Sequence, residues 1–543
     1  MSQQKEIQYR EIDIIFADFI HRLAGENAFP ELKETALKLS YAIGRGASCI
    51  QITDSGLREK LLKCSAVVGC WPQDALTTPL LLDGDLLYFQ KMLKEELQLA
   101  ELIKNIAQRP MPALPADTLD QLFSPMPSSE AVDAQKAAVR KTLAAPLAII
   151  CGGPGTGKTT VASALLCQEL QRTAPEKIAV AAPTGKAHAR LMESLLSDSC
   201  KFDIPEETRE IFSSLPGGTI HRLLGWGNSG PKYNKDNRLP YDLILLDECS
   251  MISLNIMTVL LSALPDHARL VLLGDAAQLA SVDAGMVFSD LCRAVKEAQE
   301  PHAIKNILSE LTYNFRAASA PELISLADAL RQGILPENLE ILPVPEKKKT
   351  AETFQQDWTV YQKIAELCSK NPVEENLKKA FELLETFKII CAVKDKSKCG
   401  TAGLNAAVMK FLDAKENTPG VPIMIRHNNY DLGLFNGDIG LIVPGNKAVF
   451  PGHPAPFPLG FLPEYDIAYT ITAHKSQGSG YDNVVLLLPD EETPLVNREL
   501  IYTAVTRARK TARIYGKKEL VLQALADFNS RASGLAKRLL ENQ

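Results

Sequence analysis

Residues 152–159 read Gly-Gly-Pro-Gly-Thr-Gly-Lys-Thr and fit the phosphate-loop pattern GxxxxGK followed by Ser or Thr. An apolar run, 146–151, precedes them and an Ala- and Leu-rich segment, 160–170, follows, so the pattern predicts a buried strand, a glycine loop and a helix. Glycines let the backbone wrap a triphosphate, whose charge faces the amides at the helix N-terminus. We expect Lys158 to reach the β- and γ-phosphates and the Thr159 hydroxyl to bind Mg²⁺. The alternative, a glycine-rich turn with a chance lysine, is disfavoured by these flanks.

The composition is that of a globular chain with several cores. Its 543 residues suit about three or four domains, and 46% hydrophobic and 23% charged residues are ordinary proportions. The 11 cysteines form no CxxC pair, which favours reduced thiols over disulfides or a zinc site. We expect a cytoplasmic protein with no membrane partner, because the sequence has neither a bilayer-length apolar run nor the apolar core of a signal peptide. The net charge of −6 gives no global argument for nucleic-acid binding, so such a function must come from motifs.

Periodicity divides the first half of the chain into two regions. Residues 1–110 are expected to be helical, because 13–23 and 86–93 place apolar residues at helical spacing, and a proline-rich stretch follows. From 128 to 303, apolar runs alternate with helical stretches, which predicts a parallel sheet covered by helices, with a small insertion at about 195–235. The expected strands of this region are 146–151, 177–182, 241–246 and 269–273.

A second α/β region is expected over 304–414 and 466–543. Its strand candidates are 387–393 and 483–488. Between its two parts, 415–465 is rich in Gly, Pro and Asn and has short β-like pieces, which predicts a small inserted β domain.

Two carboxylates follow the apolar run 241–246. At the carboxyl end of a parallel strand, Asp247 and Glu248 would face the nucleotide crevice. We expect Asp247 to hold Mg²⁺ through water and Glu248 to polarise the attacking water. Asp247 could instead cap the following helix, but the phosphate loop makes that reading the weaker one.

Three polar residues further along the chain complete the candidate site. Gln278 follows the run 269–273 and is placed to sense the γ-phosphate, although its spacing also suits an ordinary loop residue. Arg316 and Arg507 lie in the second α/β region, and arginines from a neighbouring domain stabilise charge on a transferring phosphoryl group. A single arginine is usually only a surface residue, so neither is decisive alone.

The chain carries its motifs in a fixed order: 152–159, 182–187, 219–223, 247–250, 274–278, 314–316, 472–478 and 502–509. This series resembles the motif series of superfamily 1 helicases. The residues within the motifs are similar to those of the RecD branch, the alpha subunit of exodeoxyribonuclease V. The resemblance runs from about 130 to 515 and implies an α/β fold with two RecA-like motor domains. Residues 434–438 resemble the stretch that leads into the small SH3-like insertion of that branch. Residues 37–46 and 49–52 are similar to its N-terminal, partner-docking domain.

The resemblance implies a role for each residue at a matching position. The catalytic set is Lys158, Asp247, Glu248, Gln278, Arg316 and Arg507, with Mg²⁺ held by Thr159 and Asp247. ATP would be bound by Gln135, which matches an adenine-reading glutamine, and by Gly152, Gly153, Pro154, Gly155, Thr156, Gly157, Lys158, Thr159 and Thr160. Single-stranded DNA would pass Thr184, Thr219, His221, Thr472 and His474; a weaker alternative is that the two histidines are packing residues.

As function, the resemblance implies an ATP-dependent DNA helicase of 5′→3′ polarity. It would act with RecB-like and RecC-like partners in a RecBCD-type helicase–nuclease, in double-strand break repair and recombination. One alternative is a stand-alone RecD-like helicase. Another is a structural ATP-binding subunit, which the presence of Glu248 and two arginines disfavours because binding alone does not need them. The sequence has no clustered acidic nuclease motif, so any nuclease activity is expected in a partner.

Overall fold

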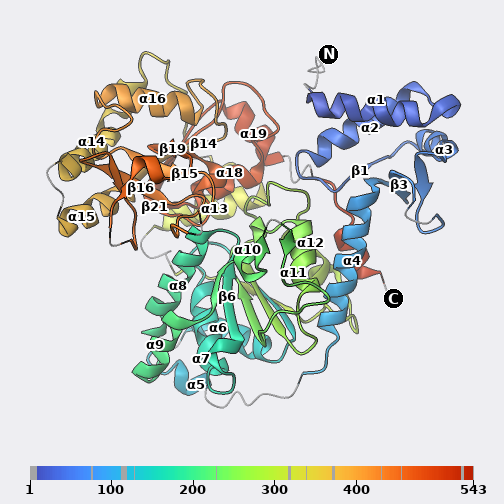
Figure 1. The fold of residues 1–543 in the computed structure, drawn as a ribbon, viewed down its shortest axis with the longest axis horizontal. Coiled ribbons are helices and arrows are strands. Elements are labelled where there is room, and N and C mark those ends of the chain that lie inside the picture. The colour runs from blue at the N-terminus through green and yellow to red at the C-terminus, as the bar shows by residue number, and fades with distance from the viewer. Residues whose placement is uncertain are drawn as a thin grey trace.

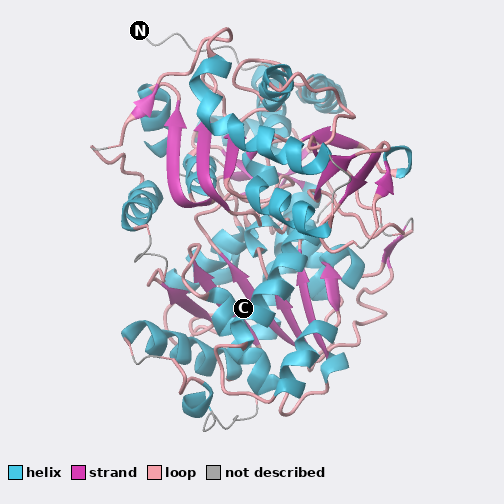
Figure 2. Ribbon diagram, turned by 90° about the vertical axis from the view of Figure 1, so that its left-hand side faces the viewer, coloured by secondary structure: helices cyan, strands magenta, loops and turns pink. Residues whose placement is uncertain are grey.

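The computed structural model describes residues 9–74, 77–111, 119–126, 129–227, 229–315, 320–337, 339–369, 373–429, 431–453, 455–526 and 531–541. These residues form two α/β bodies, an antiparallel sheet packed on the second of them, and an N-terminal body (Figure 1). The sheets of the two α/β bodies lie one above the other in Figure 2. Within the described residues, no helix combines the length and apolar character that crossing a bilayer would need.

The first α/β body is built on a six-stranded parallel sheet in the order β12-β5-β11-β10-β6-β7. Its strands are β5 (Leu147–Gly152), β6 (Ile178–Ala182), β7 (Gly217–Thr219), β10 (Leu243–Leu246), β11 (Arg269–Gly274) and β12 (Leu308–Leu311). The four apolar runs expected to be strands are β5, β6, β10 and β11, and all are buried throughout. Because β12 pairs with β5, this body continues past the expected boundary at residue 303. The four residues of β12, Leu-Ser-Glu-Leu, neither alternate nor form a continuous apolar run, so their pattern does not reveal such an edge strand.

Helices cover both faces of this sheet. One face packs against α6 (Glu130–Leu143), α7 (Lys158–Glu169), α8 (Gly185–Ser199) and α9 (Glu206–Ser214). The other face packs against α11 (Leu254–Ser262), α12 (Val287–Glu297), α4 (Gln90–Ala107) and α20 (Leu535–Leu540). The sequence assigned α4 to the N-terminal region and α20 to the second α/β region, whereas both complete the core of the first body. An amphipathic pattern shows that a helix has a buried face but not which body covers it.

The interval expected to hold a small insertion, about 195–235, contains α9, β7, α10 (Ile220–Leu223) and a hairpin. The hairpin consists of β8 (Trp226–Gly227) and β9 (Gly230–Pro231). Since β7 extends the main sheet, the hairpin is the part of this interval that stands apart from it.

The second α/β body has a five-stranded parallel sheet in the order β13-β22-β21-β14-β20. The strands are β13 (Ile341–Leu342), β14 (Phe387–Cys391), β20 (Thr470–Thr472), β21 (Tyr481–Leu487) and β22 (Ala508–Tyr515). Its helices are α13 (Pro321–Gln332), α14 (Thr350–Ser369), α15 (Glu374–Leu384), α16 (Thr401–Phe411), α17 (Ala473–Ser476), α18 (Arg498–Val505) and α19 (Lys518–Ala526). The two runs expected to be strands here correspond to β14 and β21.

A five-stranded antiparallel sheet lies within the sequence of the second body, in the order β18-β17-β16-β15-β19. Its strands are β15 (Pro422–Ile425), β16 (Ile439–Val443), β17 (Lys447–Val449), β18 (Phe457–Pro458) and β19 (Tyr465–Ile467). It shares one hydrophobic cluster with α14 and β14, in which Ile423 and Leu441 pack with Trp358 and Ile389. We call this sheet and its loops the inserted sheet.

The N-terminal body is not purely helical, contrary to expectation. It has α1 (Glu11–Leu23), α2 (Pro30–Ile43) and α3 (Ser55–Lys63), but also a four-stranded sheet in the order β1-β4-β3-β2. The strands are β1 (Cys49–Gln51), β2 (Val68–Cys70), β3 (Leu80–Asp83) and β4 (Leu86–Phe89). The stretch 86–93, expected to be helical, is divided between β4 and the start of α4. A short, nearly continuous apolar run suits a buried strand as well as a helix, so periodicity could not separate the two.

Candidate nucleotide site and nucleic-acid cleft

The phosphate loop joins β5 to α7, as the sequence predicts. Gly155 and Gly157 have φ of +80° and +84°, a region that favours glycine. A Cβ on Gly157 would also lie 2.1 Å from Nε2 of Gln135, so a larger residue here would displace the end of that side chain. Lys158 begins α7, and its Nζ donates hydrogen bonds to the carbonyl oxygens of Gly152 and Gly153 at 2.6 and 3.1 Å. The lysine ammonium is therefore held directly over the loop.

Two acidic side chains follow β10. Glu248 adopts φ 52° and ψ 40°, an uncommon conformation for a residue other than glycine, and so turns the chain sharply at the end of the strand. Burial, and next the charge of Glu248, raise the pKa of Asp247 to about 6, while Lys158 opposes this shift. Thr159 and Asp247 line the same groove. Their hydroxyl and carboxylate oxygens are donors that suit Mg²⁺, and a cation would relieve the repulsion between the two carboxylates, so these residues fit the metal.

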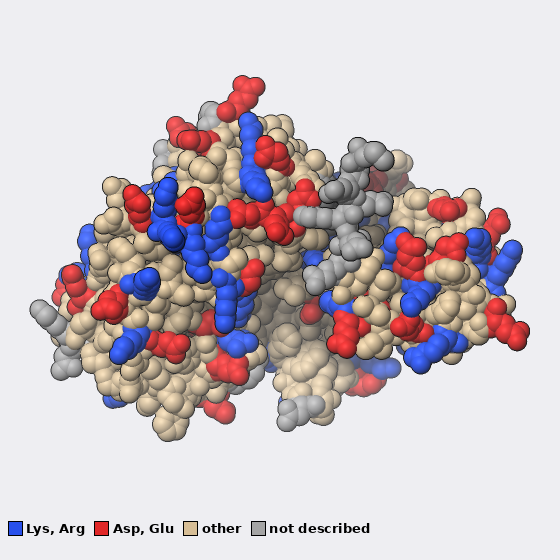
Figure 3. All heavy atoms as spheres, turned by 90° about the horizontal axis from the view of Figure 1, so that it is seen from above, with Lys and Arg blue, Asp and Glu red and all other residues tan. Residues whose placement is uncertain are grey.

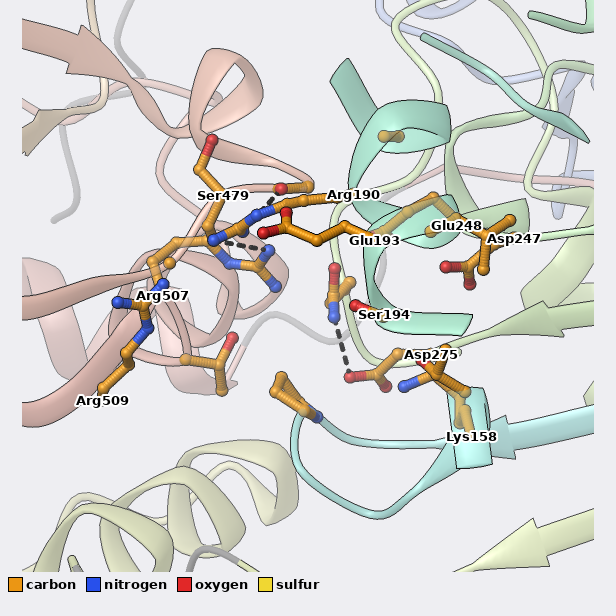
Figure 4. Close-up of a pocket in the computed structure, with 18 residues that line it drawn as sticks. Lys158, Arg190, Glu193, Ser194, Asp247, Glu248, Asp275, Ser479, Arg507 and Arg509 are labelled. Atoms are coloured by element: carbon orange, nitrogen blue, oxygen red, sulfur yellow. Dashed lines mark hydrogen bonds between the residues drawn. The ribbon is translucent and has the colours of Figure 1, made fainter. Parts of the chain in front are cut away.

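Both α/β bodies line this groove, a cavity of about 370 Å³ (Figure 4). The first body contributes Lys158, Asp247, Glu248, Asp275 and Gln278, and the second contributes Ser479, Arg507 and Arg509. Arg190 of α8 reaches across, and its Nη1 donates to the carbonyl oxygen of Gly478 at 2.7 Å. The groove thus lies at the junction of the bodies, where a change in their separation would alter its shape.

Arg507 forms part of the wall that the second body gives to this groove. It is buried, and its guanidinium donates to the carbonyl oxygens of Thr503 and Ser479 at 3.2 and 3.3 Å. Both bonds lie within the second body and hold the cation on the side of the groove opposite Lys158 (Figure 4). The other arginine expected in the site, Arg316, lies outside the described residues.

A wider cavity continues from the phosphate loop toward α6. Gln135 lines it and is 3% exposed. Tyr313 and Phe315 line the same cavity with ring centroids 5.0 Å apart, and the Phe315 amide donates to the Gly155 carbonyl at 2.9 Å. The sequence analysis drew only Arg316 from this segment. The two aromatic residues, one just before the motif 314–316 and one within it, were the available signal for a surface on which a purine could stack.

A second cleft of about 340 Å³ is lined by both α/β bodies and by the inserted sheet. It brings together three of the residues expected to meet DNA, Thr184, His221 and His474, and adds Lys186 and Lys475. Burial lowers the pKa of both histidines, so they offer neutral rings rather than fixed charges. The basic groups of this cleft therefore come from its lysines, which the sequence analysis quoted within motifs but did not select.

The three expected threonines share a structural task. Thr184, Thr219 and Thr472 each cap a helix, with the side-chain oxygen accepting from a backbone amide of the first turn. Thr219 is only 2% exposed and does not line the cleft, and Thr472 lines a neighbouring cavity beside α16. If these segments contact a DNA strand, most of the contacts would therefore be made by the backbone and by neighbouring side chains.

Two further residues, one beside the cleft and one in its lining, were not expected from the sequence. Trp226 of the β8–β9 hairpin does not line the cleft, but it is 36% exposed and its ring centroid lies 5.3 Å from that of His221, which does. Asn436 of the inserted sheet accepts a hydrogen bond from Lys475 at the rim. On the face seen in Figure 3, basic and acidic side chains are interspersed, in keeping with the net charge of −6.

Comparison with known proteins agrees with this arrangement. Residues 135–284 match the family described as AAA domain, and 467–515 match the UvrD-like helicase C-terminal domain. The RecBCD enzyme subunit RecD of Mycolicibacterium smegmatis is 34% identical over 480 residues, covering 84% of this chain and 82% of that protein. The ATP-dependent RecD2 DNA helicase of Deinococcus radiodurans is 29% identical over 446 residues, covering 78% of this chain and 54% of that protein. A solved structure of Pif1 helicases at forked duplex DNA aligns with a TM-score of 0.42 at 17% identity, over 74% of this chain and 94% of that chain.

A phosphate loop on one parallel α/β body and an arginine wall on a second, around one shared groove, define a two-domain P-loop motor of helicase superfamily 1. The identity with the mycobacterial relatives, over most of both chains, also shows the family. The chain belongs to the RecD family of RecBCD enzyme subunits.

Proposed function

We propose that this chain is the ATP-driven DNA helicase subunit of a RecBCD-type helicase–nuclease, working in the cytoplasm with RecB-like and RecC-like partners in double-strand break repair and recombination. The observation that carries the proposal is the phosphate groove shared by the two bodies, with Lys158 and Glu248 on one side and Arg507 on the other. The nucleic-acid cleft is shared by the same two bodies. A nucleotide that draws the bodies together would therefore change the grip on a strand, and repeated hydrolysis would become stepping.

Five of the residues that line the groove have a place in hydrolysis. Lys158 binds the β- and γ-phosphates, and Glu248 orients and polarises the attacking water. Mg²⁺, held by Thr159 and Asp247, would neutralise charge between the phosphates. Arg507, and Arg316 by its position in the sequence, stabilise the charge that develops on the transferring phosphoryl group.

The two smaller parts of the molecule also receive roles. We propose that the inserted sheet is the SH3-like domain of the family, a reading that its five antiparallel strands within the second body support. We propose that the N-terminal body docks on a partner subunit. Neither role follows from the motor site itself, so each needs its own test.

The N-terminal docking proposal rests on the outer face of α1. Its side chains Ile12, Ile15, Phe19 and Leu23 are 59%, 53%, 49% and 46% exposed. They recur at i, i+3, i+7 and i+11, so they form one apolar stripe, while the opposite face packs on α2. Contiguous exposed apolar surface of this kind marks interaction sites in soluble proteins. A partner subunit that covers the stripe would remove these apolar side chains from water.

Charged substitutions in the stripe test this docking. Ile15→Asp combined with Phe19→Asp should abolish copurification with two large partners and ATP-dependent DNA degradation, while DNA-stimulated ATP turnover by the isolated chain persists. The matched control is Phe461→Asp, because Phe461 is 75% exposed on the inserted sheet and should tolerate the charge without loss of assembly. Normal assembly of the doubly substituted chain would refute docking through α1.

The motor assignment is tested separately. Lys158→Gln should abolish ATP hydrolysis and unwinding by this chain but leave assembly intact, because the loop lies away from α1. We propose 5′→3′ polarity, so duplexes with a 5′ single-stranded tail should be unwound and those with only a 3′ tail should not. Efficient unwinding of 5′-tailed duplex by the chain alone, in cells where no partners copurify, would favour the stand-alone helicase.

A further inference from the structure

A tyrosine of the second α/β body contacts an acidic residue of the first beside the phosphate groove. The hydroxyl of Tyr502, on α18, donates a hydrogen bond to Oδ2 of Asp275, which follows β11, at 3.0 Å. Tyr502 is 3% exposed and Asp275 is 5% exposed, so water does not compete freely for this bond. Burial, and next the charge of Asp275, raise the pKa of Tyr502, so the phenol keeps the proton that it donates.

The same carboxylate holds Gln278. Oδ2 of Asp275 also accepts from Nε2 of Gln278 at 3.2 Å, drawn as a dashed line to Asp275 in Figure 4, while Oδ1 accepts from the Ala277 amide at 3.0 Å. An ionised carboxylate can only accept hydrogen bonds, so the Gln278 group that faces it must be the amide nitrogen. The other end of the carboxamide, Oε1, is buried and has no hydrogen-bond partner among the described residues. Gln278 lines the phosphate groove, so this unpaired acceptor belongs to a side chain of the groove wall.

We propose that Tyr502 is a positioning residue that acts through Asp275 to fix the orientation of the Gln278 carboxamide in the groove. This inference rests on the proposed motor function and names a device within the same site. An acceptor suits the O–H of an attacking water, whereas a phosphate oxygen would require a donor. Gln278 is thus oriented to hold the water that Glu248 polarises, rather than to bind the γ-phosphate directly.

Tyr502 differs from two other residues of the second body that contact the loop after β11. The Leu279 amide donates to Oγ1 of Thr503 at 2.8 Å, and Nε2 of Gln477 donates to the Leu279 carbonyl at 2.9 Å. Both of these reach only the backbone of the loop. The Tyr502 hydroxyl instead reaches the side chain that orients Gln278, and it lies close to the phosphate loop, 3.2 Å from where a Cβ on Gly153 would stand.

The consequence is a link between domain closure and water positioning. When the bodies separate, Tyr502 leaves Asp275, and Gln278 loses part of what fixes its orientation. Hydrolysis would then be slow until closure restores the bond. Tyr502 touches neither ATP nor water in this scheme, so its effect should fall on turnover rather than on nucleotide affinity.

Tyr502→Phe removes the hydroxyl alone and is the sharpest test. In DNA-stimulated ATP hydrolysis we expect kcat to fall about tenfold, the range for a buried hydrogen bond to a charged group. KM for ATP and affinity for single-stranded DNA should change less than about twofold, since neither ligand touches the phenol. Tyr361→Phe is the matched control, because its buried hydroxyl bonds the Tyr469 carbonyl at 2.9 Å in the core of the second body. If kcat fell equally in the two variants, the loss would be explained by general destabilisation of the second body, and the proposal would be overturned.

A double variant tests the route through Gln278. If Tyr502 acts by orienting this carboxamide, Tyr502→Phe should cost no further turnover in a Gln278→Ala background. A full additional tenfold loss there would overturn the route. An unchanged kcat for Tyr502→Phe in a chain whose wild type hydrolyses ATP normally would refute this inference alone, whereas a wild type without DNA-stimulated hydrolysis would refute the motor function itself.

Discussion

The carboxylate of Glu96 and the guanidinium of Arg538 lie 3.2 Å apart although 442 positions separate them in the chain. Glu96 is on α4 and Arg538 on the C-terminal helix α20, and both side chains are almost completely buried. Arg538 also donates to Asp83 of the N-terminal sheet at 2.7 Å, and Glu96 accepts from Ser48 at 2.5 Å. The end of the chain therefore fastens the N-terminal body to the first α/β body. A force applied to the N-terminal body by a partner would be transmitted through this cluster to the motor.

Glu96→Ala should cost about 3–5 kcal/mol of unfolding free energy, because Arg538 would remain buried without part of its compensation. The measurement is urea unfolding of the full chain, followed by tryptophan fluorescence. Glu375→Ala is the control, since Glu375 forms an exposed pair with Lys379 on α15 and its loss should leave stability unchanged. An equal, small effect of the two substitutions would mean that the buried cluster does not hold the bodies together.

Glu248→Gln should lower ATP turnover by roughly 10²–10⁴-fold, the usual contribution of a general base. The amide keeps the shape of the side chain but cannot take the proton from water. Nucleotide binding should persist, so the variant should retain ATP and single-stranded DNA together, as filter binding with labelled nucleotide would detect. Unchanged turnover would remove Glu248 from the role of base and leave its unusual backbone conformation without a catalytic explanation.

Structural elements that depend only on residues close together in the chain could be predicted from the sequence. The strands β5, β6, β10 and β11 are continuous apolar runs because helices cover both faces of their sheet, and the phosphate loop needs its glycines for local backbone reasons. What could not be predicted depends on pairing at long range. The docking of α20 on the first body is one example, and the bond from Tyr502 to Asp275, 227 positions apart, is another. Neither leaves a periodic or spaced pattern in the sequence.

The candidate site divides in the same way. Lys158, Asp247 and Arg507 occur in motifs whose spacing is fixed by a strand, a turn or a helix end, and the structure brings them to one groove. The threonines expected along the DNA path are helix caps in the structure, a role that the sequence pattern did not indicate. A short polar side chain can serve a ligand or its own backbone, and the sequence does not say which.

Lys388→Met should stabilise the protein at neutral pH and flatten its pH dependence. Lys388 of β14 is completely buried, its Nζ donates to the Ala468 carbonyl at 3.1 Å and lies 5.5 Å from the centroid of the Tyr481 ring. Burial, and next the charge of Lys186, lower its pKa to about 7 from an ordinary value of 10.5. Between these two pH values the unfolded chain binds more protons than the folded one, so stability rises with pH, by up to about 1.4 kcal/mol per pH unit.

Thermal unfolding from pH 7 to pH 9 measures this effect as the difference between variant and wild type, which cancels the titration of other groups. The difference should be largest at pH 7 and shrink as pH rises. Lys447→Met, at an exposed lysine in β17, should show no such trend. A constant difference across the range would mean that Lys388 keeps its proton in the folded protein and is compensated by its surroundings.

Gly185→Ala should weaken the grip on single-stranded DNA. A Cβ on Gly185, at the start of α8, would lie 2.2 Å from Cγ of Phe435 in the inserted sheet, so the loop carrying Phe435 would have to move. That loop continues into Asn436 and Gly437, which line the cleft that we propose for DNA. Overpacking of this kind costs about 1–3 kcal/mol, so we expect roughly tenfold weaker binding of an oligonucleotide by fluorescence anisotropy, with ATP affinity unchanged.

Removing the whole Phe435 side chain should reverse the defect. In the double variant Gly185→Ala with Phe435→Gly, the ring and the Cβ of Phe435, which would lie 2.2 and 2.4 Å from the added methyl group, are both absent, so most of the lost DNA affinity should return. Gly460→Ala is the control for adding a Cβ to the inserted sheet, because nothing lies within 4 Å of that position. If the second substitution restores DNA affinity, the contact between α8 and the loop of Phe435 determines the shape of the cleft. Affinity that stays low in the double variant would show that the methyl group acts on α8 alone, and that contact with Phe435 does not shape the path of the strand.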